Sequence, residues 1–212
     1  MKRYLTELIG TFFLVFTIGL VVLGGTPAAP LAIGAVLMVM VYMGGHISGA
    51  HYNPAVSVAV LMRGKMSGGD FVPYLVAQLT GAVAASLAVL AIAGDTFAPA
   101  PGGGVPAWAA LLVEVLFTFA LALVILNVAT SPKTEGNSFY GLAIGFTVAA
   151  GAFAGGPYSG GAFNPAVGIG PMLVDATMGD GSLARVWLYI VGPVVGAVLA
   201  ALVYNVQHAE EG

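Results

Sequence analysis

The chain has 212 residues, of which 59% are hydrophobic and 7% are charged. This composition excludes a soluble globular domain and indicates a protein embedded in a lipid bilayer. The formal net charge is −3 and cysteine is absent, so the sequence offers neither a basic surface for nucleic acid nor disulfide or thiol chemistry.

Six apolar stretches follow one another along the chain, separated by short polar or Gly- and Pro-rich segments. They cover residues 5–24, 31–45, 71–93, 106–129, 139–154 and 184–206. A helix needs about 20 apolar residues to span the bilayer, and the longer stretches supply them. The stretches that begin at 31 and 139 are shorter, but each leads into a repeated phrase. The sequence predicts an all-α membrane protein with six transmembrane helices.

The repeated phrase reads S-G-A-H-Y-N-P-A-V at 48–56 and S-G-G-A-F-N-P-A-V at 159–167. Asn-Pro suits the start of a helix, because Asn caps the N-terminus and Pro is favoured at the first helical position. About ten apolar residues follow each Asn, and ten residues of helix rise about 15 Å, half of a hydrocarbon core of about 30 Å. We therefore expect two re-entrant half-helices, beginning at Pro54 and Pro165, that meet in the middle of the bilayer.

The two halves of the chain are similar beyond this phrase. Two further pairs of segments match, 6–12 with 113–119 and 74–83 with 189–198. The first pair aligns Glu7 with Glu114. Each half then has three spans, and this odd number forces the second half to enter the membrane upside down relative to the first. The predicted organisation is a first inverted repeat, a linker and a second inverted repeat, at 1–98, 99–105 and 106–212.

The basic residues predict the orientation of the chain in the membrane. Five of the six fall on one side of the predicted spans, namely Lys2, Arg3, Arg63, Lys65 and Lys133. Only Arg185 falls on the other side. Because cytoplasmic loops carry an excess of Lys and Arg, we expect an integral, multi-pass protein of the cell membrane with both termini in the cytoplasm.

Two half-helices that meet at the bilayer centre predict a pore that discriminates by charge. Each helix N-terminus has about half a positive charge, so a cation or proton arriving between two of them is repelled. A neutral molecule can instead exchange hydrogen bonds with loop carbonyls and with the amides of Asn53 and Asn164. We expect passive passage of water and small uncharged solutes. No nucleophile–base pair or metal-ligand spacing occurs, which argues against an enzyme, a metal site or a cofactor.

These motifs resemble those of the aquaporins, the major intrinsic protein family. The resemblance rests on H-I-S-G-A-H-Y-N-P-A-V at 46–56, A-G-G-P-Y-S-G-G-A-F-N-P-A-V at 154–167, and the two aligned glutamates. It implies a right-handed bundle of six helices with two re-entrant half-helices, assembled as a homotetramer with one pore in each subunit.

The resemblance also implies roles for individual residues. Asn53 and Asn164 would orient the permeating molecule, Glu7 and Glu114 would brace the loops before the half-helices, and His51 would line the pore. The two pore motifs are Asn53, Pro54 and Ala55, and Asn164, Pro165 and Ala166.

The chain departs from the family pattern at the outer selectivity filter. Most members continue the second motif as Asn-Pro-Ala-Arg, whereas this chain has Val167. Counting from the two Asn residues as the family pattern does, the other filter positions are Ile33, Ala152 and Gly161. This ring lacks both a fixed cation and an aromatic or His wall. We expect it to be wide and apolar, and to admit water and solutes such as glycerol, urea, peroxide or ammonia.

Two other functions are compatible with parts of the sequence. Inverted repeats with broken helices also build secondary transporters, but these need coupling groups at the substrate site. Only Glu7 and Glu114 are candidates, and both lie toward the starts of helices. The other alternative is a junctional protein with a poorly conducting pore, against which the two intact Asn-Pro-Ala motifs argue.

Overall fold

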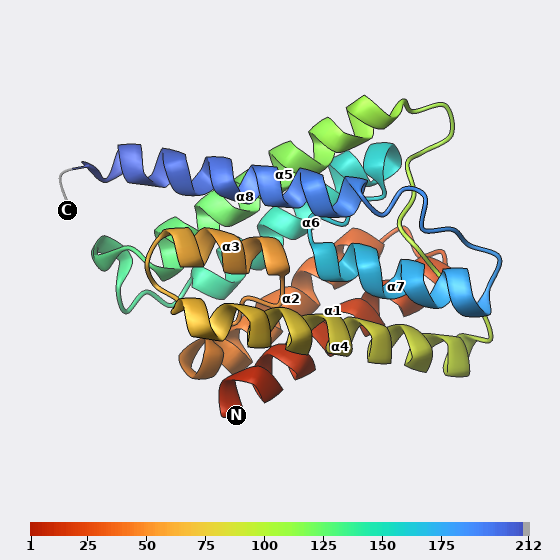
Figure 1. Cartoon of the computed structure of the whole chain (residues 1–212), viewed down its shortest axis with the longest axis horizontal. Coiled ribbons are helices and arrows are strands. Elements are labelled where there is room, and N and C mark those ends of the chain that lie inside the picture. The colour runs from red at the N-terminus through yellow and green to blue at the C-terminus, as the bar shows by residue number, and fades with distance from the viewer. Residues whose placement is uncertain (210–212) are drawn as a thin grey trace.

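A computed structural model describes residues 1–209, which contain eight α-helices, one short 3-10 helix and no strand (Figure 1). In chain order the helices are α1 (Lys2–Leu23), α2 (Ala29–Ser48), α3 (Pro54–Met62), α4 (Gly68–Ala93), α5 (Ala107–Ala129), η1 (Pro132–Thr134), α6 (Tyr140–Ser159), α7 (Pro165–Met178) and α8 (Leu188–Gln207). Six helices are long, and two shorter ones follow the Asn-Pro motifs. The predicted all-α class is confirmed. The last three residues of the second predicted repeat, 210–212, lie outside the described part.

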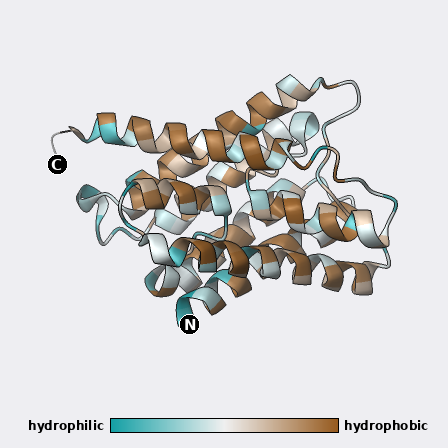
Figure 2. Ribbon diagram, in the orientation of Figure 1, coloured by the Kyte–Doolittle hydropathy of each residue, from teal (hydrophilic) through white to brown (hydrophobic). Residues whose placement is uncertain are grey.

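Five helices are long and apolar enough to cross a membrane, namely α1, α2, α4, α5 and α8. The sixth predicted span, α6, is as long as α2 but is rich in glycine and alanine, and it is not among these five. Figure 2 shows hydrophobic residues along the long helices and hydrophilic ones mainly at helix ends and in connecting segments. Large apolar side chains such as Val72, Ile92 and Val206 are exposed on the outside, as expected of a surface that contacts lipid.

The two halves pack their helices in the same way. Helix α4 packs on α1 in the first half, α8 packs on α5 in the second, and α2 packs on α6 between the halves. A β-carbon added at Gly34 of α2 would meet the carbonyl oxygen of Gly145 of α6, and one added at Gly145 would meet that of Gly34. Glycine at both positions lets the two backbones touch, which is how helices approach closely in membranes.

The two half-helices α3 and α7 meet near the middle of the molecule, where Figure 1 shows them nearly end to end. Each begins with proline after an asparagine cap. The Asn53 Oδ1 accepts the backbone N–H of Ala55 at 2.8 Å, and the Asn164 Oδ1 accepts that of Ala166 at 2.9 Å. Helix α3 has 9 residues, close to the expected length.

Helix α7 is longer than about ten residues, the length expected from the sequence. It has 14 residues and continues through Pro171 to Met178. The interior proline removes one backbone hydrogen bond but does not end the helix here. The helix stops at Gly179, whose backbone is extended.

Candidate pore

The two asparagines of the repeated motifs join the half-helices to each other. The Asn53 Nδ2 donates to the carbonyl oxygen of Phe163, and the Asn164 Nδ2 donates to that of Tyr52, both at 2.9 Å. Each asparagine therefore caps its own helix with its oxygen and binds the opposite motif loop with its nitrogen. As a result, two positively polarised helix ends face one region in the protein interior.

The motif loops, residues 49–53 and 160–164, have unusual backbone geometry. Ala50, Tyr52 and Phe163 have φ angles of 50°, 50° and 49°. Left-handed backbone at a residue other than glycine costs about 1–3 kcal/mol and persists only where surrounding contacts hold it. The contacts that hold these loops come from the two aligned glutamates.

Glu7 of α1 binds the first motif loop with both carboxylate oxygens. It accepts hydrogen bonds from the Ser48 Oγ at 2.7 Å, the His51 N–H at 3.0 Å and the Tyr52 N–H at 2.7 Å. The Gln78 Nε2 of α4 donates a fourth bond at 2.9 Å. The glutamate is fully buried. Its oxygens therefore accept these four hydrogen bonds in a place that water does not reach.

Glu114 of α5 repeats this arrangement in the second half. It accepts from the Ser159 Oγ at 2.7 Å, the Ala162 N–H at 3.1 Å and the Phe163 N–H at 2.7 Å. The second half has no counterpart of the Gln78 bond, because the aligned residue is Pro193. Neither Glu7 nor Glu114 lines the central cavity described next. Their positions therefore do not favour the transporter alternative, which needs carboxylates at the substrate site.

A cavity of about 360 Å³, here called the central cavity, lies where the half-helices meet. It brings together residues that are far apart in the sequence. Among them are all four predicted filter residues, both motif asparagines and the predicted pore-lining histidine: Ile33, Ala152, Gly161, Val167, Asn53, Asn164 and His51. The rest of the wall is mostly aliphatic. No Asp, Glu, Lys or Arg among the described residues lines this cavity.

Known proteins are similar to this chain over nearly its whole length. The family model described as Major intrinsic protein matches residues 1–204. The chain belongs to this family. Because its members are passive membrane channels, this major intrinsic protein is an integral, multi-pass membrane channel and not an enzyme, as predicted.

Several curated relatives align along nearly the full length of this family member. It is 39% identical to the glycerol uptake facilitator protein-like 6 of Lactiplantibacillus plantarum, over 100% of both chains. It is 38% identical to the aquaporin AqpM of Methanothermobacter thermautotrophicus, over 99% of this chain and 98% of that protein. Its fold is similar to the X-ray structure of the aquaglyceroporin from Plasmodium falciparum, with a TM-score of 0.86 and 23% identity over 96% and 95% of the two chains.

The four predicted filter residues, here called the outer ring, come from four different segments of this channel. Ile33 belongs to α2, Ala152 to α6, Gly161 to the second motif loop and Val167 to α7. Gly161 has a φ of +66°, a conformation that side chains other than glycine rarely adopt. At position 167, where the family pattern predicts arginine, the side chain is the aliphatic and buried Val167.

The connection between α4 and α5, which includes the end of the first predicted repeat and the start of the linker, contributes to the cavity, and this was not predicted from the sequence. Phe97, Ala98, Pro99 and Ala100 all line it. Phe97 is buried and lies against Gly19, where a β-carbon would collide with its ring. A large aromatic residue within a Gly- and Pro-rich segment was the available sign that this segment folds inward.

His51 lines the central cavity and is held in place by hydrogen bonding. Its Nδ1 lies 3.0 Å from the Ser57 Oγ, which also accepts the Gln78 Nε2 at 3.1 Å. Its ring centre lies 5.1 Å from that of Tyr74. Ser57, Tyr74 and Gln78 were not predicted as functional residues. Gln78 is the one amide side chain within the apolar helix α4, and this isolation was the signal that could have found it.

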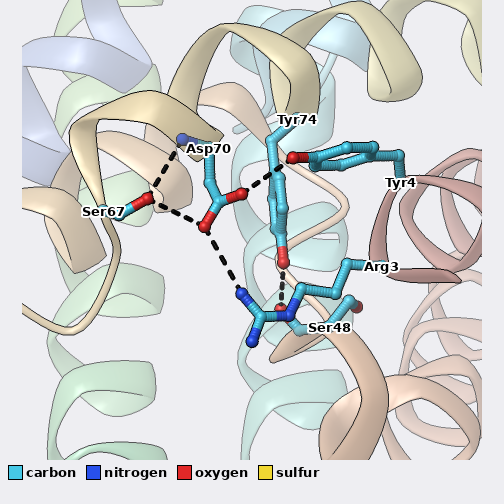
Figure 3. Close-up of polar contacts among 6 residues, drawn as sticks. All are labelled: Arg3, Tyr4, Ser48, Ser67, Asp70 and Tyr74. Carbon is cyan, nitrogen blue, oxygen red and sulfur yellow. Dashed lines mark hydrogen bonds and ion pairs between the residues drawn. The ribbon is translucent and has the colours of Figure 1, made fainter. Parts of the chain in front are cut away.

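Two further cavities, of about 400 and 510 Å³, adjoin the end of the bundle that contains the N-terminus, and together they are called the inner vestibule. Figure 3 shows the polar cluster at its rim. Asp70 accepts hydrogen bonds from the Tyr4 hydroxyl at 2.8 Å and the Ser67 Oγ at 2.8 Å, and pairs with Arg3 at 3.4 Å. These contacts join the start of α1 to the start of α4.

Proposed function

We propose that this protein is a passive channel for water and small uncharged solutes, with glycerol, urea, peroxide and ammonia as candidates. The single observation behind the proposal is the central cavity, which reaches both motif asparagines and has no charged side chain in its described wall. Relatives named as a glycerol uptake facilitator and as an aquaporin support the same substrate class.

In this proposal the half-helix N-termini exclude ions and protons. The two crossed asparagine bonds keep both helix ends directed at the same point of the path, where a cation meets two partial positive charges. Asn53 and Asn164 then orient the permeating molecule, and Glu7 and Glu114 brace the loops. The loss of the ring arginine removes one cation barrier, so the paired helix ends must supply most of the discrimination.

The proposal includes the arrangement of the chain in the membrane. Residues 1–98 and 106–212 form two inverted repeats joined by the linker 99–105, and the matching hydrogen bonds of Glu7 and Glu114 support this division. Both termini lie on the cytoplasmic side of the cell membrane, as the basic residues predict. The channel assembles as a homotetramer with one pore per subunit, by analogy with its family.

The test is to compare wild type with Val167→Arg in proteoliposomes, by stopped-flow light scattering with water, glycerol, urea and peroxide. A guanidinium in the outer ring narrows it and adds a charge. We expect fast glycerol or urea flux in wild type, which the substitution abolishes while water flux survives. A wild-type protein that passes only water, or nothing, would overturn the proposal of a wide outer ring.

A further inference from the structure

The inverted repeat gives the outer ring a counterpart at the other end of the central cavity. In the alignment that pairs Asn53 with Asn164, Ile33 pairs with Ile144, Ala152 with Val41, Gly161 with Ala50, and Val167 with Val56, which lines the central cavity itself. In the alignment that pairs Glu7 with Glu114, Ile125 of α5 pairs with Ile18 of α1, which also lines the central cavity.

Three of the outer-ring counterparts, Val41, Ala50 and Ile144, lie together with Ile125 where the central cavity meets the inner vestibule. Ile125 is the one described residue that lines the central cavity and both cavities of the vestibule. Ala50 and Ile144 line the central cavity and one vestibule cavity, and Val41 lines that same vestibule cavity. The four side chains, here called the inner ring, are Val41, Ala50, Ile125 and Ile144. These side chains stand where the central cavity adjoins the vestibule, so a molecule that moves from one to the other passes them.

The inner ring is made of larger residues than the outer ring. Val41 stands in place of Ala152 and Ala50 in place of Gly161, whereas Ile144 matches Ile33 in size. Beside the ring, His51 takes the place that Ala162 has in the second motif loop. All four inner-ring side chains are buried, and none can form a hydrogen bond with a passing molecule.

We propose that the inner ring, and not the outer filter, sets the upper size limit for solutes in this channel. This inference rests on the proposed channel function. It assigns the size selectivity of the channel to the inner ring. A solute that passes the wide outer ring must lose most of its hydration to cross a ring of aliphatic side chains. A bulkier molecule is stopped there by size.

Hydrogen bonds hold the part of the inner ring that comes from the first motif loop. The first motif loop contains Ala50 and is tied to Glu7 by the N–H groups of His51 and Tyr52. The Tyr74 hydroxyl also donates to the carbonyl oxygen of Ser48, directly before this loop, at 2.7 Å (Figure 3). The backbone that positions Ala50 and His51 is therefore fixed from two helices, α1 and α4.

The test replaces two inner-ring residues by their outer-ring counterparts and changes the size of a third. The double variant Val41→Ala and Ala50→Gly leaves the rest of the path unchanged, and glycine suits the φ of +50° at position 50. The single variant Ile125→Ala widens the ring, and the single variant Ile125→Phe closes it. The matched control is Leu116→Ala, which removes an exposed side chain of the same helix α5. Permeability to water, urea, glycerol and a four-carbon polyol is measured by stopped-flow light scattering, per amount of reconstituted protein.

We expect the double variant and Ile125→Ala to raise glycerol and polyol permeability several-fold, with a smaller change for water. Ile125→Phe should reduce all fluxes, and Leu116→Ala should behave as wild type. If wild type conducts and Val167→Arg reduces its flux, but the inner-ring variants leave the size limit unchanged, the inference is wrong and the proposed function stands. If wild type shows no flux above empty liposomes, the proposed function fails and the inference fails with it.

Discussion

Glu7 and Glu114 show how single buried residues determine the shape of the pore. Each carboxylate accepts hydrogen bonds from two consecutive backbone N–H groups and a serine of its motif loop. A loop in a membrane cannot obtain these bonds from water, so a protein group must supply them. The same carboxylates hold Tyr52 and Phe163 in left-handed backbone, which directs their carbonyl oxygens to the motif asparagines.

This role predicts the effect of removing one carboxylate. In Glu7→Gln, one accepting oxygen becomes an amide group whose hydrogens face other donors. Each buried donor left without an acceptor costs about 1–3 kcal/mol, so we expect a clear drop in the melting temperature of the detergent-solubilised protein. The control is Glu135→Gln, an exposed carboxylate on the connection between α5 and α6. Equal melting temperatures for Glu7→Gln and wild type would show that Glu7 does not brace the loop.

At the scale of elements, the two half-helices combine a structural and an electrostatic role. Their N-termini are fixed to each other by the bonds from Asn53 and Asn164, and their first residues are buried. Two helix ends of the same polarity repel each other, and the crossed bonds offset this repulsion. The arrangement concentrates positive potential at one place, and no Asp, Glu, Lys or Arg of the described residues lines the cavity there.

The electrostatic role predicts what a negative charge at this place does. Asn164→Asp keeps the capping oxygen but replaces the donor to Tyr52 with a carboxylate oxygen between the two helix ends. We expect sodium or proton leakage above the wild-type level, measured with ion-sensitive dyes in proteoliposomes. Asn164→Ser is the neutral control, because serine also caps helices but adds no charge. If the aspartate variant leaks no more than the serine variant, the helix ends are not the ion barrier.

At the scale of the whole molecule, the sequence predicts much of the fold because membrane constraints are visible in it. Hydropathy and length predict the long helices, and the duplicated phrase predicts the half-helices. The ends of elements are less predictable. The stretch expected to end at 154 continues as α6 through Pro157 to Ser159, where Gly160 with a φ of +90° ends it.

The wall of the pore is only partly predictable. The four outer-ring residues meet at one cavity, as the family pattern implied, but their selectivity role stays a prediction. The contribution of Phe97 and its neighbours depends on how a loop folds over α1, which no local pattern encodes. The inner ring likewise emerges only when Ile125 and Val41 from different helices come together.

The most direct test of the central claim measures neutral and ionic flux in the same vesicles. Wild-type protein is reconstituted into liposomes loaded with a pH-sensitive dye, and glycerol influx is followed by light scattering while a pH gradient is applied. The account predicts glycerol influx well above that of empty liposomes, proportional to the glycerol gradient without saturation, and proton leakage no faster than in empty liposomes. Glycerol flux that saturates or depends on the pH gradient, or proton leakage through the protein, would contradict it.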